Sequence, residues 1–183
     1  VRAGLEKLRT QPRQGIFSLA QAAGIDLKKC DASTLGFGLG PRLNAAGRLE
    51  SALTALNLLT TRNLLESGQL AQKLDSYNQE RQSLTQEIRQ KAAEMVLRED
   101  PEAILFFAVA PEFSEGVVGL AASRLVESFY RPSIVGHQGE IFTVASCRSI
   151  PEFHITRALD ECSDLLVRHG GHAAAAGFTV LNE

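Results

Sequence analysis

The sequence predicts an α/β protein in which helices come first and a small mixed sheet comes last. Residues 64–98 contain no proline and a single glycine, with apolar residues three and four positions apart, as in one long amphipathic helix. After Pro101 the pattern changes to short apolar runs punctuated by glycine and proline, which is typical of alternating strands and helices. The chain has 183 residues and is 44% apolar, enough to bury a core.

The first thirty-five residues predict short helices. Residues 1–8 place three apolar side chains on one face, and residues 16–23 end at Gly24, a residue type that commonly closes a helix. Three side chains are candidates to cap the segment that follows: Asp31, Ser33 and Thr34. These helices are too short to enclose a core alone, and the chain begins without methionine, so we expect a piece of a longer protein.

Gly36–Glu50 is the most unusual stretch, with four glycines and no carboxylate before its last residue. Glycines permit tight turns, and Pro41 disfavours helix at the residue before it, so we expect a tight loop that leads into a buried helix over residues 49–59. Arg42 and Arg48 would then lie near a helix N-terminus, where the dipole and free N–H groups favour anions. The alternative is that both arginines pair with carboxylates elsewhere.

The long helix has a narrow apolar seam that only Arg81 interrupts. The seam consists of Leu70, Leu74, Tyr77, Leu84, Ile88, Ala92 and Met95. Such a stripe suits either a coiled coil or a connector that packs on its own domains, and one polar break in about four heptads favours the connector. Asp100 followed by Pro101 ends the helix.

The remaining residues predict strand, helix, strand, strand, helix and strand, a compact α/β arrangement. The continuous apolar run 103–110 suits a buried central strand, and residues 116–126 form a helix rich in small residues that can pack closely on a sheet. The other predicted elements are strands over 133–137 and 141–145, a helix over 156–167 and a closing strand over 174–180.

Two loops of this second half carry chemistry. Ser146–Ser149 (SCRS) follows a strand and offers two hydroxyl groups and the Arg148 guanidinium, a set that suits a phosphate. In residues 169–177 the pair Gly170 and Gly171 presents backbone N–H groups, and His172 can donate to a phosphate or serve as an acid. The alternatives are a surface arginine with polar neighbours and a histidine that is packed and satisfied.

Composition excludes several classes of protein. The net charge is −2, with 14 Lys/Arg against 11 Asp/Glu in residues 1–100 and 5 against 10 afterwards, so a polyanion would be read by local arginines. Three cysteines without a paired spacing favour a reducing compartment and exclude a disulfide framework. No run approaches the 18 or so apolar residues of a membrane span.

Four motifs in order resemble the RecJ family, the single-stranded-DNA-specific 5′→3′ exonucleases of the DHH phosphoesterase superfamily. They are Gly40–Leu49 (GPRLNAAGRL), Gly116–Gly119 (GVVG), Ser146–Ser149 and Gly170–Gly177 (GGHAAAAG). The glycine-histidine-alanine element is common to the superfamily, whereas the first motif is much more specific to the RecJ branch. The resemblance extends over essentially the whole chain.

The resemblance implies three parts: the end of the DHH catalytic domain (1–62), a connector helix (63–100) and the DHH-associated domain (101–183). It implies that Asn44 and Arg48 face the scissile phosphate and the metal centre. It also implies that Ser146 and Arg148 hold the terminal 5′ phosphate or the backbone next to it, and that His172 lies close by from the second domain. Together with the anion-binding residues found above, the candidate site comprises catalytic Asn44, Arg48 and His172, and DNA-binding Arg42, Ser146, Arg148, Ser149, Gly170 and Gly171.

The resemblance also implies Mn²⁺ or Mg²⁺ in the parent enzyme, bound by aspartates and an Asp-His-His element that have no counterpart in this sequence. We therefore expect no metal site here, and an inactive fragment of a monomeric, cytoplasmic enzyme of DNA repair and recombination that binds single-stranded DNA. Cys147 stands where the family commonly has glycine. Two other readings stay open: a non-catalytic nucleic-acid-binding module, and a DHH phosphodiesterase for short oligonucleotides or cyclic dinucleotides.

Overall fold

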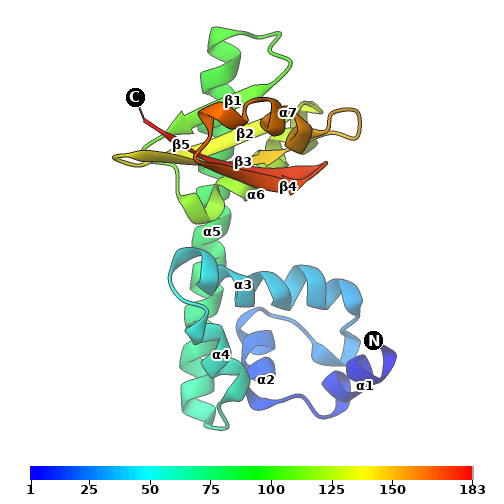
Figure 1. Ribbon diagram of the computed structural model, residues 1–183. Helices are drawn as coiled ribbons and strands as arrows, with labels where there is room; N and C mark the ends of the chain where they lie inside the picture. Colours follow the sequence, from blue (N-terminus) through cyan, green and yellow to red (C-terminus); the bar gives the residue numbers. More distant parts are fainter. Residues whose placement is uncertain (183) are drawn as a thin grey trace. The chain divides into compact units, whose positions relative to one another are not determined.

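The structure is a computed structural model that describes residues 1–182 (Figure 1). It divides into two compact units: unit 1 spans Val1–Gln82, and unit 2 begins at Ser83. The division falls inside helix α5 (Leu64–Glu99), which contributes its first half to unit 1 and its second half to unit 2. The sequence instead predicts the helix to be a part of its own, with domain boundaries near residues 62 and 100. Those boundaries stay a prediction.

Unit 1 is built entirely from helices. Its core contains Leu19, Leu39, Leu58 and Leu74, which come from four different helical segments and are almost fully buried. The expected short helices are both present, with slightly shifted ends. The elements before α5 are α1 (Arg2–Thr10), α2 (Gln14–Ala22), η1 (Leu27–Lys29), η2 (Thr34–Leu39), α3 (Gly40–Leu49) and α4 (Leu53–Thr60).

The tight loop expected over residues 36–48 is wrong, because this stretch is helical. A π-helical segment, η2, runs directly into α3, and Gly40 has helical angles (φ −56°, ψ −48°) despite the following Pro41. Proline clashes chiefly with a preceding Cβ, which glycine lacks, and its own missing N–H costs nothing in the first turn of a helix. The buried helix expected from residue 49 begins only at Leu53.

Asp31 caps this helical stretch. Its carboxylate accepts hydrogen bonds from the Thr34 N–H and hydroxyl, both at 2.7 Å, and the Thr34 hydroxyl in turn accepts from the Asp31 N–H at 3.2 Å. This reciprocal pair satisfies N–H groups that would otherwise lack partners at the helix start. The Thr34 hydrogen bonds lower the pKa of Asp31. Among the three capping candidates, Asp31 is the residue that accepts these bonds.

The long amphipathic helix is confirmed as α5, which has 36 residues. Its buried line nevertheless differs from the expected seam, because it includes Ser67, Asn78 and Thr85, whereas Tyr77 and Met95 are only half-buried. Asn78 is buried at 2% exposure and accepts a hydrogen bond from Arg81. Ala71 and Leu74 of α5 lie in the core of unit 1, so the helix packs on its own chain, as the connector interpretation requires.

Unit 2 is a five-stranded mixed sheet in the order β1-β2-β3-β5-β4, with β1 parallel to β2 and the other neighbours antiparallel. Helix α6 packs on β2 and β3, whereas α7 packs on β4 and β5, on opposite faces of the sheet (Figure 1). The elements after α5 are β1 (Phe106–Ala110), α6 (Glu115–Phe129), β2 (Ser133–Gln138), β3 (Phe142–Arg148), α7 (Ile155–Glu161), η3 (Ser163–Leu165), β4 (Arg168–His172) and β5 (Ala175–Leu181).

Four expectations for unit 2 are corrected. The apolar run 103–110 forms an edge strand rather than a central one, begins only at Phe106, and leaves Phe107 54% exposed. The helix expected over 156–167 ends at Glu161. The glycine pair lies in strand β4 of a β4–β5 hairpin rather than in a loop, because its backbone pairs with β5. Ser146 and Arg148 likewise belong to the last residues of β3.

Alternation along the strands separates two faces of the sheet. Ala145, Cys147 and Phe178 point into the core that includes Ile155 and Leu159 of α7. Residues of the opposite parity point to the face that α6 partly covers. Of the helices in the described part of the chain, none combines the length and the apolar character that crossing a membrane requires.

The cysteines offer a direct check on this core. Cys30 and Cys147 are buried and Cys162 is exposed. Burial raises the pKa of the Cys147 thiol to about 12, so almost none of it is the reactive thiolate at neutral pH. We expect iodoacetamide to alkylate Cys162 quickly in the native protein and to reach the other two only after unfolding, as measured by peptide mass mapping. Equal labelling of Cys147 and Cys162 in the native protein would contradict this packing.

Candidate nucleic-acid interface

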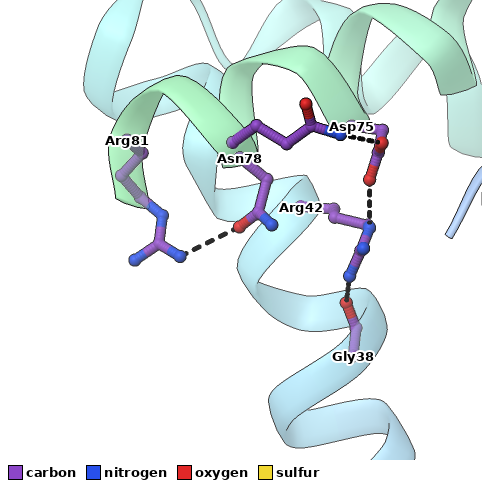
Figure 2. A network of polar contacts seen from close by, with 6 residues as sticks. Gly38, Arg42, Asp75, Asn78 and Arg81 are labelled. Atoms are coloured by element: carbon purple, nitrogen blue, oxygen red, sulfur yellow. Dashed lines mark hydrogen bonds and ion pairs between the residues drawn. The ribbon is translucent and has the colours of Figure 1, made fainter. Parts of the chain in front are cut away.

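Helix α3 is fastened to α5 near its start by Arg42 (Figure 2). The Arg42 Nε lies 2.7 Å from Asp75 Oδ1, and its Nη1 donates to the Gly38 carbonyl at 2.7 Å. Gln79 donates to the second Asp75 oxygen at 2.8 Å. Both charged side chains are partly buried, which strengthens such a pair compared with one in open solvent. Arg42 therefore pairs with a carboxylate, the alternative left open above, and its role in binding phosphate stays a prediction.

A second contact fastens α3 near its end. Glu50, the residue after α3, accepts a hydrogen bond from the Tyr77 hydroxyl, and the Lys73 ammonium lies 3.1 Å from its carboxylate. The Tyr77 hydrogen bond, followed by Lys73, lowers the pKa of Glu50. Because Arg42 and Glu50 both attach to α5, the helix between them is held in a defined orientation.

Asn44 and Arg48 lie on the outer side of this fastened helix. Both are exposed, one helical turn apart, whereas Ala45 and Ala46 between them are fully buried. An amide and a guanidinium on one helix face can contact neighbouring phosphate oxygens of a nucleic acid. The structure thus brings together two of the three residues expected to be catalytic, on one surface of unit 1.

In unit 2 the strand register brings most of the remaining candidates onto one face of the sheet. Ser146 pairs with Gly177, which pairs with Gly170, so these three residues form one row across β3, β5 and β4. Two positions further along the strands, Arg148 pairs with Ala175 and Ala175 pairs with His172, so these residues form a second row parallel to the first. Neighbouring strands lie about 4.8 Å apart, so each row spans about 10 Å. The middle residue of each row is Gly or Ala, which leaves space between the polar groups at the two ends.

The surface formed by these two rows, the sheet-face site, lies beside α6. A Cβ added to Gly119 of α6 would lie 3.1 Å from Arg148 Nη2 and 3.2 Å from Ser146 Oγ, so only glycine lets the helix approach these side chains without displacing them. Arg148 is half-buried and donates from Nη1 to the Cys147 carbonyl at 2.7 Å. Gly170 and His172 are exposed at the far side of the site.

A shallow depression of about 360 Å³ lies beside the first row, and it is lined by a cationic side chain, Arg168, that the sequence alone did not indicate. Arg168 lines the depression together with Ser146, Gly170 and Gly177, and its Nε donates to the Thr179 hydroxyl at 3.0 Å. Arg168 precedes Gly170 by two positions, the spacing of one strand face. That signal becomes readable once residues 168–172 are known to form a strand.

Three neighbouring residues do not point to the sheet-face site. The Ser149 hydroxyl donates to the Phe153 carbonyl at 2.6 Å. Gly171 has the opposite parity to Gly170 and pairs with Ala176. His169, also on that side, lies 2.9 Å from Asp160 of α7. The proposed DNA contacts of Ser149 and Gly171 stay predictions, and any contribution of Gly171 would come through the shape of the hairpin.

Known proteins are similar in sequence to this chain over nearly its whole length. The chain is 40% identical over 182 residues to the single-stranded-DNA-specific exonuclease RecJ of Bacillus subtilis, and the match covers 98% of the chain and 23% of that protein. It is 36% identical over 189 residues to RecJ of Escherichia coli, covering 97% of the chain and 32% of the relative. No protein-family model matches the chain.

The chain belongs to the RecJ family. The crystal structure of Thermus thermophilus RecJ in complex with Mg²⁺ matches it with a TM-score of 0.87 at 35% identity, over 100% of the chain and 28% of that structure. A structure of exonuclease RecJ bound to manganese matches with a TM-score of 0.81, over 100% of the chain and 45% of that structure. The chain therefore corresponds to less than half of these RecJ proteins.

The residues of this RecJ-family chain do not fit the metal ions found in those two structures. In the described part of the chain, no group of three or more His, Cys, Asp or Glu side chains could hold an ion. The sheet-face site instead carries Arg148, His172 and, beside it, Arg168, with no carboxylate in its rows. Such a surface suits the anionic backbone of a nucleic acid rather than a cation.

Proposed function

We propose that this chain works within a longer RecJ-type exonuclease that removes nucleotides from the 5′ end of single-stranded DNA. The observation that carries the proposal is the sheet-face site: Ser146 and Arg148 at one end, His172 and Gly170 at the other, and only Gly177 and Ala175 between them. The site is cationic, lacks carboxylates and is open enough for a phosphodiester backbone. In this proposal Ser146 and Arg148 hold the 5′ phosphate.

The proposed division of labour follows from the chemistry of each group. Hydrolysis of the phosphodiester would use Mn²⁺ or Mg²⁺ held by residues outside this chain, since the described residues do not fit a metal. Asn44 and Arg48 would contact the scissile phosphate and stabilise the charge that develops on it. His172 would donate a hydrogen bond or a proton to a phosphate of the DNA strand. Arg148, by anchoring the 5′ end, would set which bond is cut.

The shape of the sheet-face site favours a DNA strand as the ligand over a small molecule. Arg168 and the depression extend the cationic surface beyond the row of Ser146, Gly177 and Gly170, along β4 and away from His172. A phosphodiesterase for cyclic dinucleotides needs no such extension. We further propose that the enzyme acts as a monomer in the cytoplasm, in DNA repair and recombination.

The experiment that tests this proposal compares the full-length protein with the 183-residue chain. The full-length protein should release nucleotides from 5′-phosphorylated single strands in the presence of Mn²⁺ or Mg²⁺, lose this activity with a chelator, and spare blunt duplexes. The 183-residue chain should bind single strands weakly and cleave none, because no metal-binding cluster is found among the residues that the structure describes. Preferential cleavage of cyclic dinucleotides, or binding without cleavage by the full-length protein, would contradict the proposal.

A further inference from the structure

Phe37 is an aromatic side chain that the fold of unit 1 leaves in solvent. It is 84% exposed, whereas Leu39, two residues later in the same π-helical segment, is 2% exposed and packs in the core. An exposed phenylalanine forgoes the favourable free energy of burial, so the fold of unit 1 gains nothing from it. π-Helical turns occur frequently at functional sites, and this one lies immediately before α3.

The surroundings of Phe37 leave its ring accessible. Its two neighbours are glycines, Gly36 and Gly38, so no adjacent side chain covers the ring. A Cβ added to Gly36 would meet nothing within 4 Å, whereas one added to Gly38 would lie 2.8 Å from Ile25 Cδ1, so the open side is that of Gly36. A flat molecule could therefore approach the face of the ring without displacing protein atoms.

Phe37 lies on the same continuous helical stretch as Asn44 and Arg48, the two residues proposed to contact the scissile phosphate. Asn44 and Arg48 are four residues apart, the spacing of one α-helix face, and Phe37 lies in the π-helical segment that leads directly into α3. Phe37, Asn44 and Arg48 are exposed, whereas Ala45 and Ala46 are buried. At about 1.5 Å per residue, Phe37 lies roughly 10 Å from Asn44 along the helix axis.

Together, Phe37, Asn44 and Arg48 have the chemistry of a single-strand binding surface. Proteins that bind single-stranded nucleic acid combine aromatic rings, on which bases stack, with cationic and polar groups that contact the backbone. Phe37 suits the first role, and Asn44 with Arg48 suits the second. The nearest following carboxylate, Glu50, is occupied by Tyr77 and Lys73.

We propose that Phe37 is a stacking platform for an unpaired nucleobase of the DNA strand. The inference rests on the proposed exonuclease function and adds to it a residue that favours single strands, because the bases of a duplex have both faces covered. Stacked nucleotides advance about 3.4 Å each, so the base on Phe37 would lie roughly three nucleotides from the phosphate at Asn44.

The test is a double-mutant cycle in the full-length exonuclease, in which the Phe37 ring and one DNA base are removed separately and together. One abasic nucleotide is placed at successive positions of a 5′-phosphorylated single strand, and kcat and KM are measured for wild type, Phe37→Ala, Phe37→Leu and Phe37→Tyr. At one position, base removal should raise the wild-type KM about ten-fold, the effect of losing one stacked base. Phe37→Ala and Phe37→Leu should raise the KM for the intact strand by a similar factor and then show no further loss from the abasic nucleotide.

The controls separate stacking from folding. Phe37→Tyr keeps a ring and should retain the abasic penalty, whereas Phe37→Leu keeps apolar volume but should lose it. Leu53→Ala removes another exposed apolar side chain of unit 1, 63% exposed, and should leave KM unchanged. kcat at saturating strand should change little in all four variants.

Two outcomes would overturn the inference while the exonuclease function stands. In the first, no position is sensitive to base removal, or the abasic penalty persists undiminished in Phe37→Ala. In the second, Phe37→Ala and Phe37→Leu lower kcat for all strands together with the melting temperature, which marks a packing role. A wild-type protein that degrades no single-stranded DNA would remove the proposed function itself, and this inference with it.

Discussion

Gly171→Ala should destabilise unit 2 by about 3 kcal/mol, the sum of backbone strain and forced overlap. Gly171 has φ +152°, a conformation that residues with a side chain rarely adopt. An added Cβ would lie 2.4 Å from both the Ala175 oxygen and the Ala176 Cα of the paired strand β5. Neither atom belongs to a flexible side chain, so the β4–β5 hairpin itself would have to move.

Gly170→Ala is the matched control for this effect. The two glycines are adjacent in β4, but a Cβ on Gly170 would meet nothing within 4 Å, and its φ is not positive. The measurement is the rate at which buried Cys147 is alkylated under native conditions, because this thiol becomes accessible when the sheet opens. A loss of 3 kcal/mol corresponds to a rise of roughly a hundred-fold. Equal rates in Gly170→Ala and Gly171→Ala would show that the strained backbone is not what requires glycine.

Arg148→Ala in the full-length enzyme should lower kcat/KM on 5′-phosphorylated single strands about ten- to a hundred-fold. A charge-assisted hydrogen bond to a phosphate contributes roughly 1.5–3 kcal/mol, which corresponds to this range. The preference for a 5′ phosphate over a 5′ hydroxyl should fall by the same factor, because the variant loses the group that tells them apart. Arg148→Lys should recover only part of the activity, since it keeps the charge but not the bidentate fork.

The fold supplies a control for Arg148 within the same unit. Arg124 on α6 is exposed and pairs with Glu127, so Arg124→Ala removes an equal charge away from the sheet-face site and should leave both rates near wild type. Thermal melting reports on folding, since Arg148 also bonds the Cys147 carbonyl. Equal losses on 5′-phosphate and 5′-hydroxyl strands, accompanied by a lowered melting temperature, would assign Arg148 a structural role instead.

The elements that could be predicted from the sequence are those that depend on local patterns, namely the spacing of apolar residues and the positions of glycine and proline. Helix α5 follows from 36 residues without proline and with regularly spaced apolar side chains. Helix α6 and strands β2 and β3 follow from period and punctuation in the same way. The chemistry of the candidate site was also readable, because Asn44, Arg48, Ser146, Arg148 and His172 lie in short motifs whose residue types suit a phosphate.

The elements that the sequence predicted wrongly depend on contacts between residues that are far apart in the chain. The run 103–110 is apolar enough for a central strand, but its place at the edge is decided by β2, which alone pairs with it. Residues 168–172 have two glycines and little intrinsic preference for a strand, yet they form β4 because β5 offers hydrogen bonds along their length. The glycine-rich stretch before α3 is helical because Asp31 caps it and Leu39 and Ala46 are buried in the core.

The sequence by itself determined which groups are available: two arginine-bearing motifs, a glycine pair beside a histidine, and a long helix. The tertiary structure alone decided how those groups are used. Arg42 turned out to be held by Asp75, 33 residues away, whereas Asn44 and Arg48 remain on the outer face of α3. Ser146, Gly170 and His172 share a sheet face only because the β3–β5–β4 register aligns them, and a shift of one residue would reverse that alignment.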